Sequence, residues 1–234
     1  MQLDFPELPL EALGVDYQDL KIAVYAQNLV VKASPKATAS GVLPGMTLQL
    51  ALTLCPELKT LPAAPNKQRR LLYQLAHWAY QYSHQVAIRN QGLCIEIARS
   101  ERLFGDPNSI QTQLRQACQS AARPVRMAFG NTPEMADVFL KQGICPEPHA
   151  FADTLKQSPL SATPIPMAQL KRLTNMGFRT LGDYLQMPSR SRQKRIPEST
   201  YRLLEAISGR SQTLLQWFAP APNFQQSLEF LRGL

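Results

Sequence analysis

The alternation of helix and strand signals between residues 64 and 142 constrains the fold more than any other feature. Apolar residues recur at helical spacing from Asn66, a candidate N-cap, to about Tyr82, and predict a long amphipathic helix. The signals that follow indicate a two-stranded hairpin, a helix, a strand and a second helix, over residues 85–98, 109–122, 125–129 and from Pro133 onward. This order is typical of a small α/β sheet covered by helices on one face.

The preceding segment carries the signals of a second, smaller group of elements. Two strand-like runs lie within residues 21–33, and the pair at residues 27–28 between them suits a hairpin turn. A Pro-Gly turn at residues 41–46 then leads into a predicted helix over residues 47–54, which Pro56 ends.

After residue 142 the chain changes character. Residues 143–166 contain five prolines and are predicted to form a connector. Only helix signals follow. The predicted helices cover residues 167–173 with Gly177 as a stop, a segment that begins at Thr180 or Asp183, and residues 198–208.

Composition and charge narrow the class of protein. The 234 residues, 44% of them hydrophobic, are enough to bury a core and to divide into two or more lobes. The net charge of +8 favours a polyanionic partner such as nucleic acid, although a merely basic protein has the same balance. The four cysteines are scattered, which argues against a zinc site and against disulfides. Without a signal peptide or a bilayer-length apolar run, the chain is expected to be cytoplasmic, with no membrane contact.

Four segments occur in the order found in Y-family translesion DNA polymerases and resemble that family. They are the first palm strand at Leu3-Asp4-Phe5, the fingers signature at residues 41–46 and 55–58, the second palm hairpin and its exit at residues 92–97 and 102–105, and the thumb element at residues 177–183. Residues 5–13 and 217–224 resemble more specifically the ImuB-type branch, whose members are catalytically silent relatives in bacterial mutagenesis cassettes.

The resemblance implies a mixed α/β (α+β) fold, the right hand of a Y-family polymerase. A ferredoxin-like palm would comprise residues 1–13 and 62–150, small fingers residues 14–61, and a helical thumb of the helix-hairpin-helix type residues 151–215. Residues 216–234 would be a linker toward the family's fourth domain, the little finger, which is absent from this chain.

The turn that should hold the catalytic metals lacks the acids that the family uses. Two-metal phosphoryl transfer needs several carboxylates to hold two divalent ions close together. By the resemblance, Asp4 fills the first position of a D-x-D motif, but Pro6 stands at its second acid. Gln91 and Gly92 stand where the family carries adjacent Asp and Glu. We therefore predict no metal, no cofactor and no catalytic residue, with Asp4, Gln91 and Gly92 as vestigial positions.

An alternative register of the same hairpin keeps catalysis open. If the alignment is shifted, Glu96 or Asp106 becomes a metal ligand, and the chain is an active polymerase that uses Mg²⁺.

The triphosphate-binding positions have also changed. The fingers' Y-x-A-R motif falls on residues 35–38, where only Lys36 offers a charge. The palm's N-K pair falls on Thr132 and Pro133. Three separate charge requirements thus fail together, which favours loss of catalysis over a misplaced register.

The thumb is the candidate DNA-binding region. Between residues 171 and 195 a single acid, Asp183, stands against seven cations, and we expect these cations together with Thr180 to contact phosphates: Lys171, Arg172, Arg179, Arg190, Arg192, Lys194 and Arg195. A solvated helix face is the alternative. The G-I-G turn that donates N–H groups to phosphate in the family falls on residues 163–165, where Pro164 removes a donor, so binding would depend on side-chain charge.

These expectations combine into one hypothesis and two alternatives. The hypothesis is a non-catalytic scaffold for damage-induced (SOS) translesion synthesis, located at the bacterial nucleoid. It would bind primer-template or damaged DNA weakly and bridge a sliding clamp, a RecA-like accessory protein and a DnaE-type polymerase, as the resemblance implies. The alternatives are an active error-prone polymerase and a stand-alone DNA-binding fragment.

Overall fold

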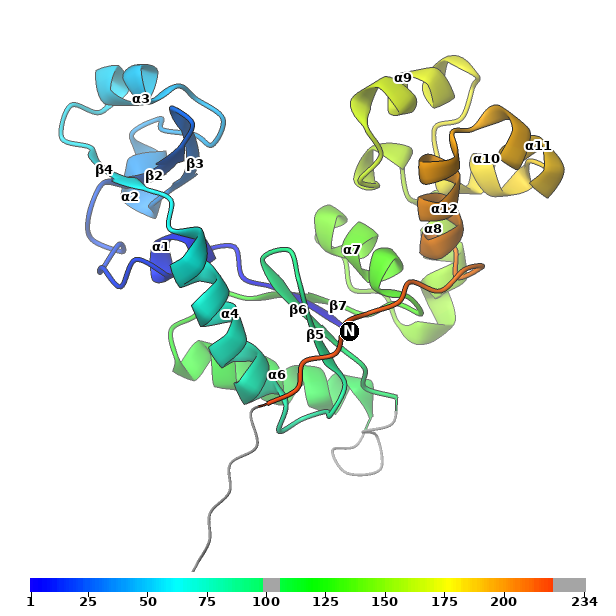
Figure 1. The fold of residues 1–234 in the computed structure, drawn as a ribbon, viewed down its shortest axis with the longest axis horizontal. Coiled ribbons are helices and arrows are strands. Elements are labelled where there is room, and N and C mark those ends of the chain that lie inside the picture. The colour runs from blue at the N-terminus through cyan, green and yellow to red at the C-terminus, as the bar shows by residue number, and fades with distance from the viewer. Residues whose placement is uncertain (99–105, 221–234) are drawn as a thin grey trace, which may run out of the picture.

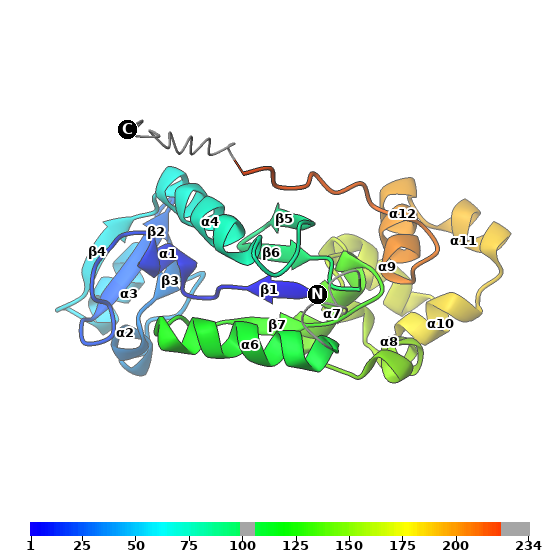
Figure 2. The same cartoon turned by 90° about the horizontal axis from the view of Figure 1, so that it is seen from below.

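The structure is a computed structural model that describes residues 1–98 and 106–220. It contains two small sheets and a helical region, and Figures 1 and 2 place these as a central unit with one lobe at either end. We call the central unit the palm, the lobe of residues 14–61 the fingers and the lobe of residues 151–215 the thumb. The predicted mixture of helices and strands is observed.

The palm is built on a four-stranded sheet in the order β5-β6-β1-β7. All of its strand pairs are antiparallel, and β1 (Gln2–Asp4) and β6 (Gly92–Ile95) lie at the centre with β5 (Val86–Arg89) and β7 (Arg126–Ala128) outside them. The helices α4 (Pro65–Ala79) and α6 (Pro107–Ser120) share a hydrophobic core with the sheet. A third helix, α7 (Pro133–Gln142), begins at the N-cap Thr132. The hairpin, the last strand and the helix at Pro133 were all predicted.

Two helix starts differ from the prediction. The helix α4 begins at Pro65, so Asn66 lies in its first turn, and no side chain caps it. The helix α6 begins at Pro107, because the side chain of Asp106 accepts a hydrogen bond from the Ser109 N–H and acts as the N-cap. The predicted hairpin exit at residues 102–105 lies outside the described residues.

The fingers hold a three-stranded sheet in the order β3-β2-β4, together with α2 (Pro35–Ala39) and α3 (Leu48–Leu54). The strands β2 (Ile22–Ala26) and β3 (Leu29–Ala33) form the predicted hairpin, whose turn residues Gln27 and Asn28 both have positive φ. The third strand, β4 (Lys59–Pro62), pairs in parallel with β2 and had no clear sequence signal. A short helix, α1 (Leu8–Glu11), connects the palm to this lobe.

The thumb is entirely helical among the described residues. Its α9 (Met167–Asn175), α10 (Leu181–Gln186) and α12 (Glu198–Ile207) match the three predicted helices, and Thr180 forms a capping box with Asp183 at the start of α10. The prediction of an irregular connector is wrong in part, because α8 (Phe151–Gln157) lies within it between two short 3₁₀ turns, η1 (Pro148–Ala150) and η2 (Leu160–Ala162). The helix α11 (Ser189–Arg195) was also missed.

The segment after the thumb returns to the palm. The N–H of Phe218 donates to the Val86 carbonyl at 2.6 Å, and Trp217 forms a bridge with Ala87 on the outer strand β5. The ring of Phe218 lies 6.0 Å from that of Tyr73 on α4. The described part of the predicted linker is therefore fixed against the sheet. Within the described residues no helix is long and apolar enough to cross a bilayer.

Candidate functional site

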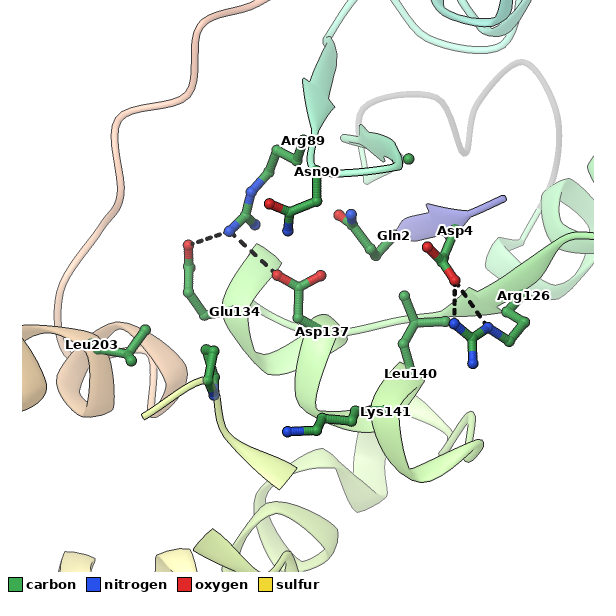
Figure 3. A pocket seen from close by; sticks show the side chains of 12 residues that line it. Gln2, Asp4, Arg89, Asn90, Arg126, Glu134, Asp137, Leu140, Lys141 and Leu203 are labelled. Carbon is green, nitrogen blue, oxygen red and sulfur yellow. Dashed lines mark hydrogen bonds and ion pairs between the residues drawn. The ribbon is translucent and has the colours of Figure 1, made fainter. Parts of the chain in front are cut away.

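A cleft of about 470 Å³ lies where the palm sheet, α7 and the first part of the thumb meet (Figure 3). Strands β1, β5 and β7 and helix α7 contribute charged side chains of both signs to its lining: Asp4, Arg89, Arg126, Glu134, Asp137 and Lys141. Asp4 and Gly92, two of the positions predicted to be vestigial, lie here opposite each other on neighbouring strands.

Asp4 faces a cation from the neighbouring strand. In the sheet register it lies opposite Arg126 on β7, and its Oδ2 accepts hydrogen bonds from Arg126 Nε at 2.9 Å and from Arg126 Nη2. The arginine therefore balances the charge of the carboxylate that the resemblance assigns to metal binding.

Gly92 has no room for a side chain. A Cβ atom built at this position would lie 1.9 Å from the carbonyl oxygen of Leu3 and 3.1 Å from Cα of Asp4. Both contacts are with the backbone of β1, so they cannot be relieved by moving a flexible side chain. An acid at position 92 would require the central pair of strands to separate.

The other residues considered for the metal site take part in local structure. Gln91 is exposed in the turn, and its carbonyl accepts the Phe5 N–H at 3.2 Å. Glu96 Oε1 accepts the Ala98 N–H at 2.9 Å, and Asp106 caps α6. Among residues 1–98 and 106–220, no group of three or more His, Cys, Asp or Glu side chains could hold a metal ion.

Two acids on α7 were not singled out from the sequence, although their three-residue spacing places them on one helix face. Arg89 of β5 lies between them, with Nη2 at 3.0 Å from Glu134 Oε1 and 3.3 Å from Asp137 Oδ2. Burial raises the pKa of Asp137 to about 6, and Glu134 and Asp4 act in the same direction, whereas Arg89 lowers it. The arginine comes from a strand 45 residues away from Glu134, so sequence spacing gives no sign of this cluster.

The positions aligned with the triphosphate-binding motifs build helix starts. Thr132 caps α7 by accepting the Met135 N–H at 3.2 Å, and Pro133 is the first residue of that helix. In the fingers, Pro35 begins α2, and Lys36 forms an exposed ion pair with Asp19 at 2.8 Å. Neither motif places a cation in the cleft.

On the thumb, six of the seven predicted phosphate-binding cations are exposed: Lys171, Arg172, Arg179, Arg190, Lys194 and Arg195. Helices α9 and α11 carry five of them, and Arg179 lies in the loop before α10. The hydroxyl of Thr180 accepts the Asp183 N–H at 3.1 Å and so serves helix capping.

The prediction for Arg192 is wrong. Its side chain is only 4% exposed, and its guanidinium lies 5.2 Å from the centre of the Tyr184 ring. Nε is 3.4 Å from Glu205 Oε1, and the Tyr184 hydroxyl donates to the same oxygen at 2.9 Å. Arg192 therefore balances a buried acid within the thumb core and is not available to DNA. Nothing in the sequence indicated this role, because Arg192 stands between Arg190 and Lys194, which are both exposed.

The segment from η2 to the start of α9 faces the palm. Lys141 Nζ on α7 donates to the carbonyls of Ser161 at 2.9 Å and Thr163 at 3.4 Å, and Pro164 lines the cleft. Thr163 and Ile165 are buried. This segment therefore joins palm to thumb.

The fold is that of a Y-family DNA polymerase. The chain matches the insertion ternary complex of Dbh DNA polymerase with a TM-score of 0.75 at 15% identity, covering 92% of this chain and 68% of that one. DinB from Sulfolobus solfataricus gives a TM-score of 0.70 at 15% identity, with the same two coverages of 92% and 68%.

Residues 10–141 match the impB/mucB/samB family, and the chain belongs to that family. Protein ImuB of Caulobacter vibrioides is 26% identical over 199 residues, which are 83% of this chain and 43% of that protein. The chain thus spans less than half the length of this curated relative. The resemblance to the Y-family and its ImuB-type branch is confirmed.

Proposed function

We propose that this protein is a non-catalytic, polymerase-like scaffold that acts in DNA-damage-related translesion synthesis. The observation that supports this most strongly is the backbone at Gly92, because an acid there would overlap the carbonyl oxygen of Leu3. The remaining aspartate, Asp4, is paired with Arg126. One paired carboxylate does not hold two divalent ions.

The electrostatics of the cleft support the same proposal. A nucleoside triphosphate entering it would approach the carboxylates of Glu134 and Asp137, and Arg89 is already engaged by both. Like charges at short range oppose binding, and burial strengthens that effect. The three acids of the lining balance its three cations, so the cleft offers no excess positive charge to a polyphosphate, whereas a polymerase must attract one.

The proposed contact with DNA is made by the exposed cations of α9 and α11. Contacts of this type are sequence-independent and weaken steeply with salt, so we expect affinities on the order of micromolar at physiological ionic strength. The proposed protein partners are a sliding clamp, a RecA-like accessory protein and a DnaE-type polymerase at the bacterial nucleoid. Holding weak partners close together raises their effective concentration without any chemistry by the scaffold.

Primer extension tests the proposal. The protein is incubated with primer-template DNA, all four deoxynucleotides and Mg²⁺ or Mn²⁺, beside an active Y-family polymerase as a control, and DNA binding is followed by fluorescence anisotropy. We expect DNA binding without extension. Templated incorporation that Asp4→Ala abolishes would show instead that the chain is an active polymerase with displaced ligands.

A binding assay with purified clamp and accessory protein separates the scaffold from a stand-alone DNA-binding fragment. A scaffold retains at least one protein partner in the absence of DNA, whereas a DNA-binding fragment retains none.

A further inference from the structure

We propose that the outer face of the fingers is a docking surface for one amphipathic α-helix of a partner protein. The proposed scaffold function gives this surface its biological use, and the physical argument rests on the fingers alone. Figures 1 and 2 place the fingers at the end of the molecule opposite the thumb, away from the helices that carry the basic residues.

The first observation is a long uncharged segment at the surface. Residues 37–56 contain no Asp, Glu, Lys, Arg or His. Within it α3 has seven residues, and only Ala51 among them is buried. Leu50, Leu52 and Leu54 are 46%, 39% and 46% exposed, which is unusual for three leucines on one short helix of a chain with a net charge of +8.

The second observation is that exposed apolar side chains gather beside this helix. We define the leucine stripe as Leu29, Val31, Leu43, Leu50 and Leu54, which are 38–47% exposed. Leu50 and Leu54 are one turn apart and share a face of α3. Leu29 forms a bridge with Thr47, the N-cap of that helix, and Leu43 begins the turn that leads into it.

A β-bulge explains why Val31 belongs to this surface. The register pairs Val24 with Lys32 and Tyr25 with Val30, so Val31 is an extra residue on β3. A bulge changes the direction in which side chains point, and the Val31 side chain is left 38% exposed. Leu29 and Val31 are thus both exposed, with the buried Val30 between them.

The backbone at this surface excludes an added strand as the occupant. The outer side of β3 is already hydrogen-bonded to the segment before α3, through Val30 N–H to the Met46 carbonyl at 2.8 Å and Gly45 N–H to the Val30 carbonyl at 2.7 Å. A peptide strand needs free donors and acceptors at a sheet edge. Nucleic acid is also excluded, because its binding needs cations and residues 37–56 supply none.

The size of the stripe argues against a second copy of this chain. Five side chains that are each a little under half exposed amount to about two fully exposed leucines, far below the roughly 800 Å² per partner of a standard interface. A single helix with apolar residues at i, i+3 or i+4 and i+7 needs only such a narrow surface. The stripe therefore fits one helix face.

The test is a selection from a peptide display library that contains both helical and extended sequences, with the full chain as bait. Binding of the enriched peptides is then measured against the wild type, the double variant Leu50→Ser/Leu54→Ser, and Leu214→Ser. Leu214 is a matched control, because its side chain is 98% exposed and lies outside the stripe. Circular dichroism melting confirms that the three proteins are equally folded.

We expect the enriched peptides to carry apolar residues at helical spacing and to bind the double variant about tenfold more weakly or worse. The Leu214→Ser variant should bind like the wild type. Amide chemical shifts of the wild type should move at residues 29–31, 43 and 50–54 when an enriched peptide is added, which locates the site without any substitution.

Three outcomes would overturn the inference: enrichment of extended or basic peptides, binding that the double variant does not weaken, or a concentration-dependent dimer in sedimentation that the double variant abolishes. None of these outcomes depends on primer extension, so failure of the docking surface and failure of the proposed function are distinguished.

Discussion

The palm and thumb share one hydrophobic core, whereas the fingers pack around two smaller clusters, one of which includes Leu10 of the connecting helix α1. Phe139 of the palm and Leu204 of the thumb belong to the shared cluster, and Thr132 Oγ1 on one side donates to the Ala206 carbonyl on the other at 2.9 Å. The clusters of the fingers contain none of these residues. The charged cleft lies in the shared body, and the uncharged outer surface lies on the separate lobe.

This difference indicates which parts of the molecule can change independently. A substitution in the cleft disturbs the hydrophobic core that the palm and thumb share. Partly buried charges in the cleft are therefore tolerated only when they are paired with one another. The outer face of the fingers contributes little to any core and tolerates apolar residues at its surface. The predictions below test this division, from the largest expected effect to the smallest.

Gly92→Ala should have the largest effect. The added Cβ overlaps the Leu3 carbonyl in the central strand pair, so we expect a loss of about 4 kcal/mol or more in the free energy of unfolding. Gln91→Glu is the matched control at the exposed neighbouring residue and should change that free energy by less than about 0.5 kcal/mol. Urea denaturation measures both, and equal stability of the two variants would show that the strands separate easily.

Arg89→Met tests whether the cleft depends on its internal charge balance. It leaves the carboxylates of Glu134 and Asp137 without their cation, and removing one partner of a buried ion pair typically costs about 3 kcal/mol. Arg126→Met removes a side chain that is 59% exposed and should cost about 1 kcal/mol or less. The same denaturation experiment compares them, and the reverse order would contradict the described burial.

The pH dependence of stability tests Asp137. Its pKa of about 6 in the folded protein lies above the ordinary value of 3.8, so the folded state binds more protons between these pH values. Stability from this group is therefore present at low pH and is lost as pH rises toward 6 and beyond. Relative to Asp137→Asn, the wild-type free energy of unfolding should fall by about 2–3 kcal/mol between pH 4 and pH 7. If the free energies of unfolding of the wild type and of Asp137→Asn changed in parallel with pH, the pKa of Asp137 would have to lie close to its ordinary value.

Local sequence signals predicted much of this architecture. The turn at Gln27-Asn28 and the helix predicted over residues 47–54 each depend on a few neighbouring residues, and the structure confirms both. Of the two predicted starts for α10, Thr180 and Asp183, the structure selects Thr180 as the N-cap. Contacts between distant segments were missed. The parallel strand β4 is stabilised by pairing with β2, and α8 lies among prolines that masked its helical signal.

The candidate site divides in the same way. The missing acids were visible as residue identities at Gln91 and Gly92, but the lack of space at Gly92 appears only when β1 is placed beside β6. The pairing of Arg89 with α7 and the burial of Arg192 also depend on which side chains meet across the core. The sequence of a basic segment does not show which of its cations forms an ion pair with a buried acid.

DNA binding separates the thumb from the fingers. The double variant Lys194→Gln/Arg195→Gln removes two exposed cations of α11. We expect about tenfold weaker DNA binding, and a slope of log affinity against log salt concentration that is shallower by about two. Lys36→Gln in the fingers is the matched control and should leave both quantities unchanged. Fluorescence anisotropy between 50 and 200 mM salt, about the range where such contacts respond, measures them. If the α11 double variant and Lys36→Gln lost the same amount of DNA affinity, the DNA contact would not be made by α11.

The smallest effect is expected at the leucine stripe, where a large chemical change should barely alter stability. Leu54→Ser replaces a side chain that is 46% exposed, and we expect a change within about 0.5 kcal/mol. Val42→Ala in the same lobe removes methyl groups from a fully buried site and should cost about 1–2 kcal/mol, because it leaves a cavity.

Hydrogen exchange after Val42→Ala should increase in the fingers and stay unchanged in the palm and thumb, since the lobe has its own core. Increased exchange throughout the molecule would mean that the fingers and the shared body unfold as one unit.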